Sequence, residues 1–257
     1  METFPSISCS NTTAVDPQQF AAKGTTLWYM LAGIVALIVS VFLVISVWGI
    51  VLIIFSAISS FLLRRKAAAL IHGSGIKVSD RQFPAIYKCA NDFKKRMNLS
   101  RDVDIYIVED NISNAFAVRI GKKNIVLLTD DIIHACEVSG RVDSLGFILA
   151  HEMAHIALNH NGIFKSWAAQ IIKIISRLNE YSADAVATAL VGDRTTAFYG
   201  LLTLTTGGEM VKFVDPDEVV KQAQEVGNSR QTKKAERGLT HPLLLNRIHR
   251  IVTTNQI

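Results

Sequence analysis

Two histidines and a glutamate stand at a spacing typical of a zinc site that activates water. They lie in the run His151-Glu152-Met153-Ala154-His155, whose flanking residues are mostly apolar. This pattern predicts a buried helix over about residues 143–160, and a spacing of four places both imidazoles on one helix face. Zinc accepts such ligands and lowers the pKa of a bound water towards 7. We therefore predict His151 and His155 as zinc ligands and Glu152 as the general base.

The residues that follow His155 exclude one class of zinc site. The metzincin pattern HExxHxxGxxH requires a glycine and a third histidine, but here Leu158 and Asn161 occupy those positions. His160 comes one position too early and falls off the ligand face of the predicted helix. We interpret His160 as a cation at the helix C-terminus rather than as a ligand.

A glutamate on the next helical run supplies the third ligand. Glu180 lies in the segment NEYSAD, residues 179–184, and on an antiparallel helix it completes a His₂Glu set of the thermolysin type. Asp184 lies four residues after Glu180 on the same face, where it can accept the other N–H of a ligand histidine. Without the HExxH motif, Glu180 and Asp184 would be interpreted as side chains on the solvent-exposed face of a helix. Together with the histidine pair they predict one zinc ion per chain, held by His151, His155 and Glu180.

These motifs resemble, in the same order, those of the HtpX-like integral-membrane zinc metallopeptidases, which are relatives of the CAAX prenyl endopeptidases. ExxxD follows HExxH, the segment Asn114-Ala115-Phe116-Ala117 resembles the family's NAFA segment, and His241-Pro242 followed by Arg247 resembles its late HP…R element. The resemblance extends over about residues 76–252. It implies an α+β fold, a mainly helical zincin (gluzincin) domain with a small β-sheet.

The same resemblance implies roles for residues outside the zinc cluster. His241 would stabilise the tetrahedral intermediate, and Arg247 would support the site through a polar contact. A peptide would add as a strand to an edge formed by Asn114, Ala115, Phe116 and Ala117.

One interval departs from the family pattern. HtpX has a second pair of membrane segments between the HExxH helix and the third ligand. Here that interval is short and carries Lys165, Lys173 and Arg177, so it cannot cross a membrane. We therefore expect an N-terminal anchor only.

The anchor is an uncharged run of 37 residues from Leu27 to Leu63, preceded by a polar segment, residues 1–26. Such a run predicts a membrane span, because the hydrocarbon core needs about 20 helical residues. One straight helix of this length would be too long for the bilayer. The run therefore predicts either one transmembrane helix or, as we favour, a tight helical hairpin that turns near Ser46–Gly49.

Charge and cysteine content bear on the compartment. The chain has a net charge of +5 and three cysteines, Cys9, Cys89 and Cys136. Residues 64–66, Arg-Arg-Lys, follow the apolar run, and the positive-inside rule then predicts a cytoplasmic domain at the cell (inner or plasma) membrane. Three cysteines without CxxC spacing are typical of a reducing compartment.

Residues 64–80 are predicted to be a linker, with Gly73 and Gly75 as breakers, and the resemblance implies that residues 81–257 form the zinc metallopeptidase domain. Helices are predicted over 81–97, from a Thr129 cap to 138, from an Asp143 cap to 160, over 165–191, and from Thr240 onwards. Strands are predicted over 104–110, 114–120 and 125–129. The polar segment 226–239 is expected to be mobile.

Taken together, the sequence predicts a membrane-anchored zinc endopeptidase that hydrolyses unfolded or misfolded membrane proteins, in protein quality control. The alternative is a catalytically silent scaffold that binds partner peptides along the edge strand. Expected partners are a polypeptide substrate and the lipid bilayer. A nucleic-acid partner is not expected, because the chain has no basic stripe with interleaved aromatic residues.

Overall fold

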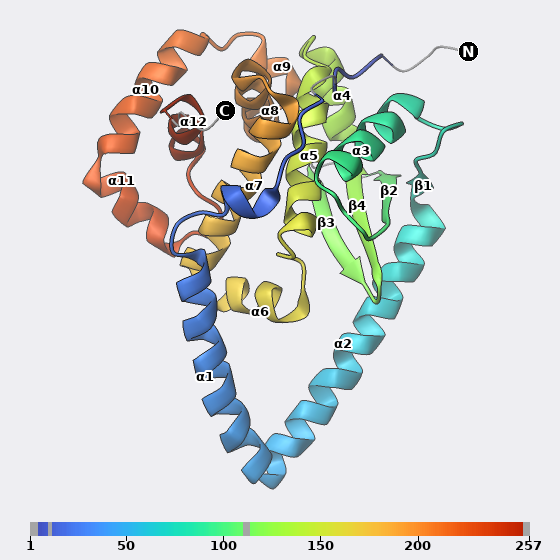
Figure 1. The fold of residues 1–257 in the computed structure, drawn as a ribbon, viewed down its shortest axis with the longest axis vertical. Helices are drawn as coiled ribbons and strands as arrows, with labels where there is room; N and C mark the ends of the chain where they lie inside the picture. The colour runs from blue at the N-terminus through green and yellow to red at the C-terminus, as the bar shows by residue number, and fades with distance from the viewer. Residues whose placement is uncertain (1–4, 10–11, 110–113, 254–257) are drawn as a thin grey trace.

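The computed structural model describes residues 5–9, 12–109 and 114–253 of the chain. Two long apolar helices form a V below a domain in which helices surround one small sheet (Figure 1). The mainly helical α+β fold predicted from the sequence is confirmed.

The apolar run forms a helical hairpin. Helix α1 (Thr25–Ile45) and helix α2 (Val47–Ser74) meet at Ser46, which is extended and whose hydroxyl accepts a hydrogen bond from the backbone N–H of Gly49. A Cβ on Gly49 would collide with the Leu43 carbonyl oxygen, so a residue without a side chain permits this tight turn. Both helices are long and apolar enough to cross a membrane. The hairpin is the form that the sequence favoured.

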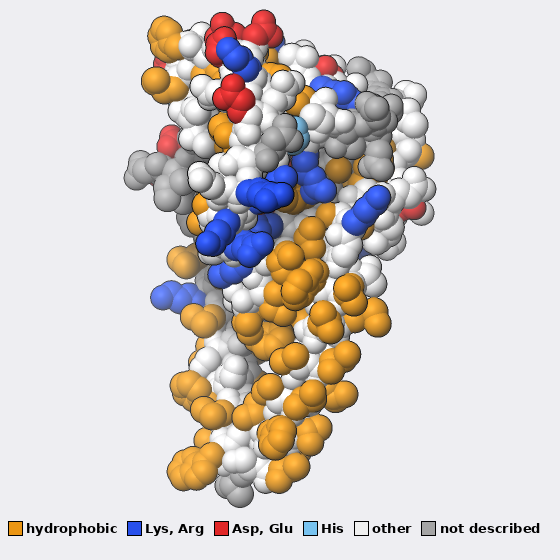
Figure 2. Space-filling model, turned by 90° about the vertical axis from the view of Figure 1, so that its left-hand side faces the viewer, with side chains coloured by type: hydrophobic (Ala, Val, Ile, Leu, Met, Phe, Trp, Pro, Cys, Tyr) orange, Lys and Arg blue, Asp and Glu red, His pale blue; other side chains and the backbone are white. Residues whose placement is uncertain are grey.

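The surface of the hairpin is apolar, as a bilayer requires. Along both helices the large aliphatic and aromatic side chains are exposed, and Figure 2 shows them covering this part of the molecule. Lys and Arg side chains gather where the hairpin meets the domain (Figure 2). Helix α2 continues past Arg64 to Ser74, so much of the expected linker is helical.

The residues before α1 form a strap over the domain, defined here as the described residues between 5 and 24. It includes a short 3₁₀ helix, η1 (Pro17–Phe20). Val15 is buried in the main core, and its N–H donates to the carbonyl of Arg96. The N–H of Ala22 donates to the Ser182 hydroxyl. The polar segment that the sequence placed outside the domain is therefore packed against it.

A disulfide joins this strap to the domain, which differs from the reducing compartment that the cysteine spacing led us to expect. Cys9 and Cys89 are bonded across 80 residues of sequence, with their Cα atoms 5.6 Å apart. Cys136 is a free thiol in the core, and burial raises its pKa to about 12.

The sheet has four strands in the order β1-β2-β4-β3. The strands are β1 (Ile76–Lys77), β2 (Val103–Val108), β3 (Ala115–Ile120) and β4 (Lys123–Thr129). β2 and β4 are parallel, whereas β3 pairs with β4 antiparallel and forms an edge of the sheet. The strand predicted over 104–110 ends at Val108, and Asp110 lies outside the described residues.

The helices of the domain include those predicted, in the same order, and further helices between residues 194 and 238 that the sequence analysis did not predict. They are α3 (Pro84–Arg96), α4 (Asp130–Val138), α5 (Asp143–Ala157), α6 (Ile163–Ile171), α7 (Lys173–Val191), α8 (Arg194–Thr206), α9 (Gly208–Val211), α10 (Pro216–Asn228), α11 (Arg230–Ala235), the 3₁₀ turn η2 (Glu236–Gly238) and α12 (Leu244–Thr253). The Thr129 cap of α4 is confirmed, because its hydroxyl accepts from the N–H of Ile132.

The helix prediction is wrong in several places. The run predicted over 165–191 breaks at Ile172 into α6 and α7. The segment expected to be mobile, residues 226–239, contains the end of α10, α11 and η2. Asp143 is the first residue of α5 rather than its cap, and its carboxylate accepts the N–H of Ser8 in the strap.

Helix α5 is the centre of the core. Its residues from Ser144 to Ala150 are all buried, and α7 and α8 pack against it. At Gly200 of α8, an added Cβ would collide with the Phe147 ring, so this glycine permits close helix packing. The buried position of α5 holds its histidines rigidly against α7.

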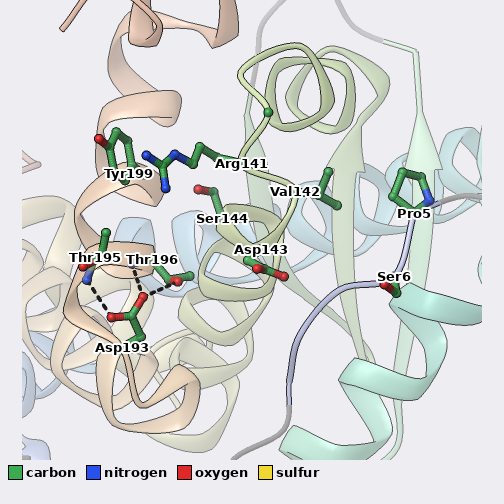
Figure 3. Close-up of a pocket in the computed structure, with 11 residues that line it drawn as sticks. Pro5, Ser6, Arg141, Val142, Asp143, Ser144, Asp193, Thr195, Thr196 and Tyr199 are labelled. Carbon is green, nitrogen blue, oxygen red and sulfur yellow. Dashed lines mark hydrogen bonds between the residues drawn. The ribbon is translucent and has the colours of Figure 1, made fainter.

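The Asp193 cap of α8 gives a test of local stability. Its carboxylate accepts the backbone N–H groups of Thr195 and Thr196 and the Thr196 hydroxyl (Figure 3). Although burial raises the pKa of Asp193, these hydrogen bonds lower it more, so the pKa is depressed in the folded state. The stabilisation therefore exists above the unfolded-state pKa and is lost as pH falls through the folded-state value.

We expect Asp193→Ala to lower the free energy of unfolding by about 1 kcal/mol at neutral pH. The difference from the parent chain should shrink as the pH falls below about 4. Thermal unfolding of the detergent-solubilised chain measures both. A difference that is the same at pH 7 and pH 3 would contradict the cap.

Candidate metal centre

The two histidines of α5 point one ring nitrogen each at the same space. The Nε2 atoms of His151 and His155 are 3.1 Å apart. His151 is buried and His155 half-buried. The four-residue spacing of an otherwise apolar helix produces this geometry.

Glu180 reaches the same space from α7. Its carboxylate oxygens lie 3.5 Å from His151 Nε2 and 3.4 Å from His155 Nε2. Glu180 is buried, as expected for a helix that packs along α5. The three residues predicted as ligands are therefore together, and their donor atoms lie within 4.8 Å of one another.

These separations fit a zinc ion. Donors placed about 2.0–2.1 Å from zinc in a tetrahedron lie roughly 3.4 Å from one another. The two Nε2 atoms are 3.1 Å apart, and each lies 3.4–3.5 Å from a different oxygen of the Glu180 carboxylate, close to that spacing. Two imidazoles and one carboxylate are also the donor set of catalytic zinc sites that keep an open position.

Asp184 and Arg247 form the outer support of the site. The Nδ1 atom of His151 lies 3.0 Å from Asp184 Oδ1. Arg247 of α12 donates to both oxygens of Asp184, at 2.8 and 2.7 Å, and its guanidinium lies 3.6 Å from Glu180. The structure thus brings both residues to the positions where the sequence placed them. A buried bidentate pair of this kind orients the carboxylate that faces His151.

His160 corrects the sequence interpretation. It is buried, and its Nδ1 lies 3.0 Å from Nδ1 of His155. Burial lowers its pKa well below the usual value, so it is not a helix-terminal cation. Helix α5 has ended at Ala157, and Asn159 with φ of +56° turns the chain back. His160 therefore does not lie on a face of α5, and its position relative to the ligands cannot be deduced from helical spacing. Asn159, a residue type that often ends a helix, was the sequence signal for this break.

His241 approaches the cluster from the loop before α12. Its Nδ1 lies 3.4 Å from Glu180, while its side chain is 70% exposed. The His241 imidazole thus contacts the cluster on one side and solvent on the other, a position from which it could contact a bound substrate. The helix predicted to start at Thr240 begins at Leu244, so His241 lies on a loop.

Glu152 lies between these features on α5 and is half-buried. Burial opposes a raised pKa of Arg247, but the charges of Asp184, Glu180 and Glu152 outweigh it and raise that pKa. Glu152 therefore lies close enough to interact electrostatically with the residues of the site. The geometry does not assign it a hydrogen-bond partner, so its role as general base remains a prediction.

Charge coupling in the cluster has a direct consequence for metal binding. Burial opposes the charge on His151, but hydrogen bonds to Asp184 and Glu180 outweigh it and raise the pKa of His151 to about 10. Burial opposes the charge on Glu180 as well, yet the three neighbouring histidines hold its pKa well below the usual value. A metal ion must therefore displace a proton from His151, and its affinity should rise with pH.

The predicted substrate strand is the sheet edge β3. The N–H of Thr129 donates to the Asn114 carbonyl, so the backbone of Asn114 is used within the sheet. In an antiparallel ladder the backbone groups of alternate residues point to opposite sides, which directs those of Ala115 and Ala117 away from β4. Phe116 is exposed.

A further buried carboxylate near the site was missed by the sequence analysis. Glu236 of η2 accepts the Tyr181 hydroxyl at 2.9 Å and a hydrogen bond from Asn246. Arg177 donates to the carbonyls of Arg237 and Leu239. These contacts hold the loop that carries His241 against α7, and no spacing in the sequence signals them.

A cavity of about 360 Å³ lies elsewhere, between the strap and the N-terminal ends of α5 and α8 (Figure 3). Arg141, Asp143, Ser144, Asp193 and Tyr199 are among the residues that line it. None of the zinc-cluster residues contributes to it, so it is separate from the candidate metal centre.

Comparison with known proteins decides the family. The model of "Peptidase family M48" matches residues 81–167 and 161–255. This chain belongs to peptidase family M48. The predicted resemblance to membrane zinc metallopeptidases is thereby confirmed, and zinc dependence is the general property of M48 peptidases.

The M48 chain also resembles a solved structure. The crystal structure of S. mikatae Ste24p matches it with a TM-score of 0.52 and 17% sequence identity, over 90% of this chain and 68% of that one. At this identity the match shows a shared fold. No curated protein matched the chain.

Proposed function

We propose that this M48 chain is a membrane-anchored zinc endopeptidase that cleaves unfolded or misfolded membrane proteins. The observation that carries the proposal is the convergence of His151, His155 and Glu180, with Glu152 beside them on α5. The peptidase domain would comprise residues 81–257, held to the bilayer by the hairpin.

The mechanism assigns one task to each side chain. When zinc is bound by His151, His155 and Glu180, it supplies Lewis acidity and makes water nucleophilic near neutral pH. Glu152 accepts a proton from the attacking water and later gives it to the leaving amine. His241 donates to the oxygen of the scissile carbonyl as negative charge develops there. Asp184, oriented by Arg247, positions the His151 ring.

The substrate would bind by strand addition to β3. The backbone N–H of Ala115 already donates to the side-chain oxygen of Asn114, so the groups of Ala117 that point away from β4 would offer hydrogen bonds to an extended chain. Recognition of backbone rather than side chains favours unfolded segments over a specific sequence.

A paired measurement of zinc and activity tests the proposal. Purified chain should contain about one zinc per molecule and cleave casein or an unfolded membrane protein. Glu180→Ala should lose the metal, and the zinc affinity of the parent chain should rise with pH because His151 must lose a proton. Glu209→Ala, at an exposed position, is the control and should keep both metal and cleavage. Cleavage by a metal-free Glu180→Ala chain would refute the proposal.

We place the catalytic domain on the cytoplasmic side of the membrane. Arg64, Arg65 and Lys66 on α2 support this orientation through the positive-inside rule. The Cys9–Cys89 disulfide argues for an oxidising compartment instead. Green fluorescent protein and alkaline phosphatase fused to the C-terminus test the orientation. A fluorescent first fusion and an inactive second are expected, and the reverse result would move the domain outside.

A further inference from the structure

Helix α6 carries its apolar side chains on the outside. Its exposed residues form one helical face, called here the α6 face: Ile163, Phe164, Trp167, Gln170 and Ile171. Four of the five are large and apolar, and Ile163 is 67% and Trp167 44% exposed. A surface helix of a water-soluble domain has the opposite arrangement, with the apolar stripe inward.

The inward side of the same helix is small or polar. Ala168 is buried, and Lys165 points back into the protein, where its ammonium donates to the Leu158 carbonyl and lies 4.9 Å from the centre of the Tyr29 ring. This lysine is half-buried, and the burial lowers its pKa. The orientation of α6 is therefore held by specific contacts.

The position of α6 is at the level expected for the bilayer–water interface. In Figure 1 it lies crosswise between the arms of the V, where α1 enters the domain. Ala168 packs with Ala32 of α1, beside Trp28 and Tyr29, and a Cβ on Gly33 would lie 3.8 Å from the Phe164 ring. Trp28 and Tyr29 begin the membrane run, and such aromatic residues mark the interface of a bilayer. The α6 face thus continues the apolar surface of α1 at the depth of the headgroups.

We propose that α6 is an interfacial helix, whose exposed face is inserted into the phospholipid bilayer between the two membrane helices. Charge favours this partner, because residues 161–179 contain no Asp or Glu that would repel anionic headgroups. The apolar face of such a helix reaches about 5–10 Å into the boundary between headgroups and acyl chains. One residue, Ile172, separates α6 from α7, so the bilayer contact supports the helix that carries Glu180.

Tryptophan quenching in vesicles tests this insertion. Trp28→Phe with Trp48→Phe leaves Trp167 as the only tryptophan of the chain. The full chain is reconstituted in phosphatidylcholine vesicles with and without bromine on the acyl chains. Bromine should reduce the Trp167 emission about twofold or more, whereas aqueous iodide should have little effect.

A matched control uses the opposite end of the domain. Phe213 is 81% exposed and comes two residues after the end of α9, a helix that lies far from the hairpin (Figure 1). In a chain without other tryptophans, Phe213→Trp should be quenched by iodide and not by brominated lipid. Should the double variant fail to fold, the parent chain and Trp167→Phe are compared, and the parent should show the larger bromine-sensitive emission.

Two results would overturn the proposal. Quenching of Trp167 by iodide but not by brominated lipid would place the α6 face in water. Protection from both quenchers would show that protein covers it, such as a second copy of the chain. Neither outcome would affect the zinc and cleavage measurements, so the two proposals fail separately.

Discussion

The Glu152→Gln variant is expected to keep its zinc and to lose peptide hydrolysis by a factor of about 10²–10⁴. The amide has nearly the same shape as the carboxylate but cannot accept the proton of the attacking water. The zinc ligands His151, His155 and Glu180 are unchanged, so the metal should remain. Initial rates on casein and metal analysis of the same sample measure both properties.

A distant glutamate provides the control for this variant. Glu218 lies in the first turn of α10 with an exposed side chain, and Glu218→Gln should match the parent in rate and zinc content. Equal cleavage by the Glu152→Gln chain would remove Glu152 from the mechanism. Loss of the metal from that variant would instead mean that Glu152 supports the site.

The Arg247→Met variant should lower the free energy of unfolding by about 3–5 kcal/mol, the usual cost of removing one partner of a buried ion pair. Arg247 donates two hydrogen bonds to Asp184, and both side chains are nearly buried. Methionine keeps much of the volume but removes both guanidinium hydrogen bonds and leaves the buried Asp184 carboxylate with His151 as its remaining charged neighbour. Thermal unfolding in a fixed detergent, with the metal removed by a chelator, measures the loss without a contribution from zinc.

An exposed ion pair shows whether the effect depends on burial. Lys212 lies 3.1 Å from Glu209 on the surface, and Lys212→Met should change the free energy of unfolding by less than about 1 kcal/mol. Arg247→Lys should fall between the two, since it keeps the charge and loses the bidentate geometry. Similar losses for Arg247→Met and Lys212→Met would refute the role given to the buried pair.

The residues of the zinc cluster could be predicted from the sequence because their arrangement depends mostly on spacing within single helices. A spacing of four residues determines which helical side chains share a face, and this holds for His151 with His155 and for Glu180 with Asp184. The family resemblance supplied His241 and Arg247, whose contacts join segments distant in the sequence. The edge position of β3 followed from the same resemblance.

The features that the sequence analysis missed depend on long-range packing or on local breaks. The pairing of Cys9 with Cys89 joins residues 80 apart, and cysteine spacing does not determine pairing. His160 was misinterpreted because the helix ends before it, at Ala157. Helix periodicity continued through Ile172, where the chain turns from α6 into α7, because both sides of the break carry apolar residues.

The disulfide also determines how the molecule responds to a cut in its own chain. Cys9 precedes both membrane helices and Cys89 follows them, so the bond closes a covalent ring that contains the entire hairpin. A single nick anywhere inside that ring leaves the peptidase domain attached to the membrane. Shedding of the domain through one such nick also requires reduction of the bond. The redox state of the compartment therefore decides whether the anchor is severable.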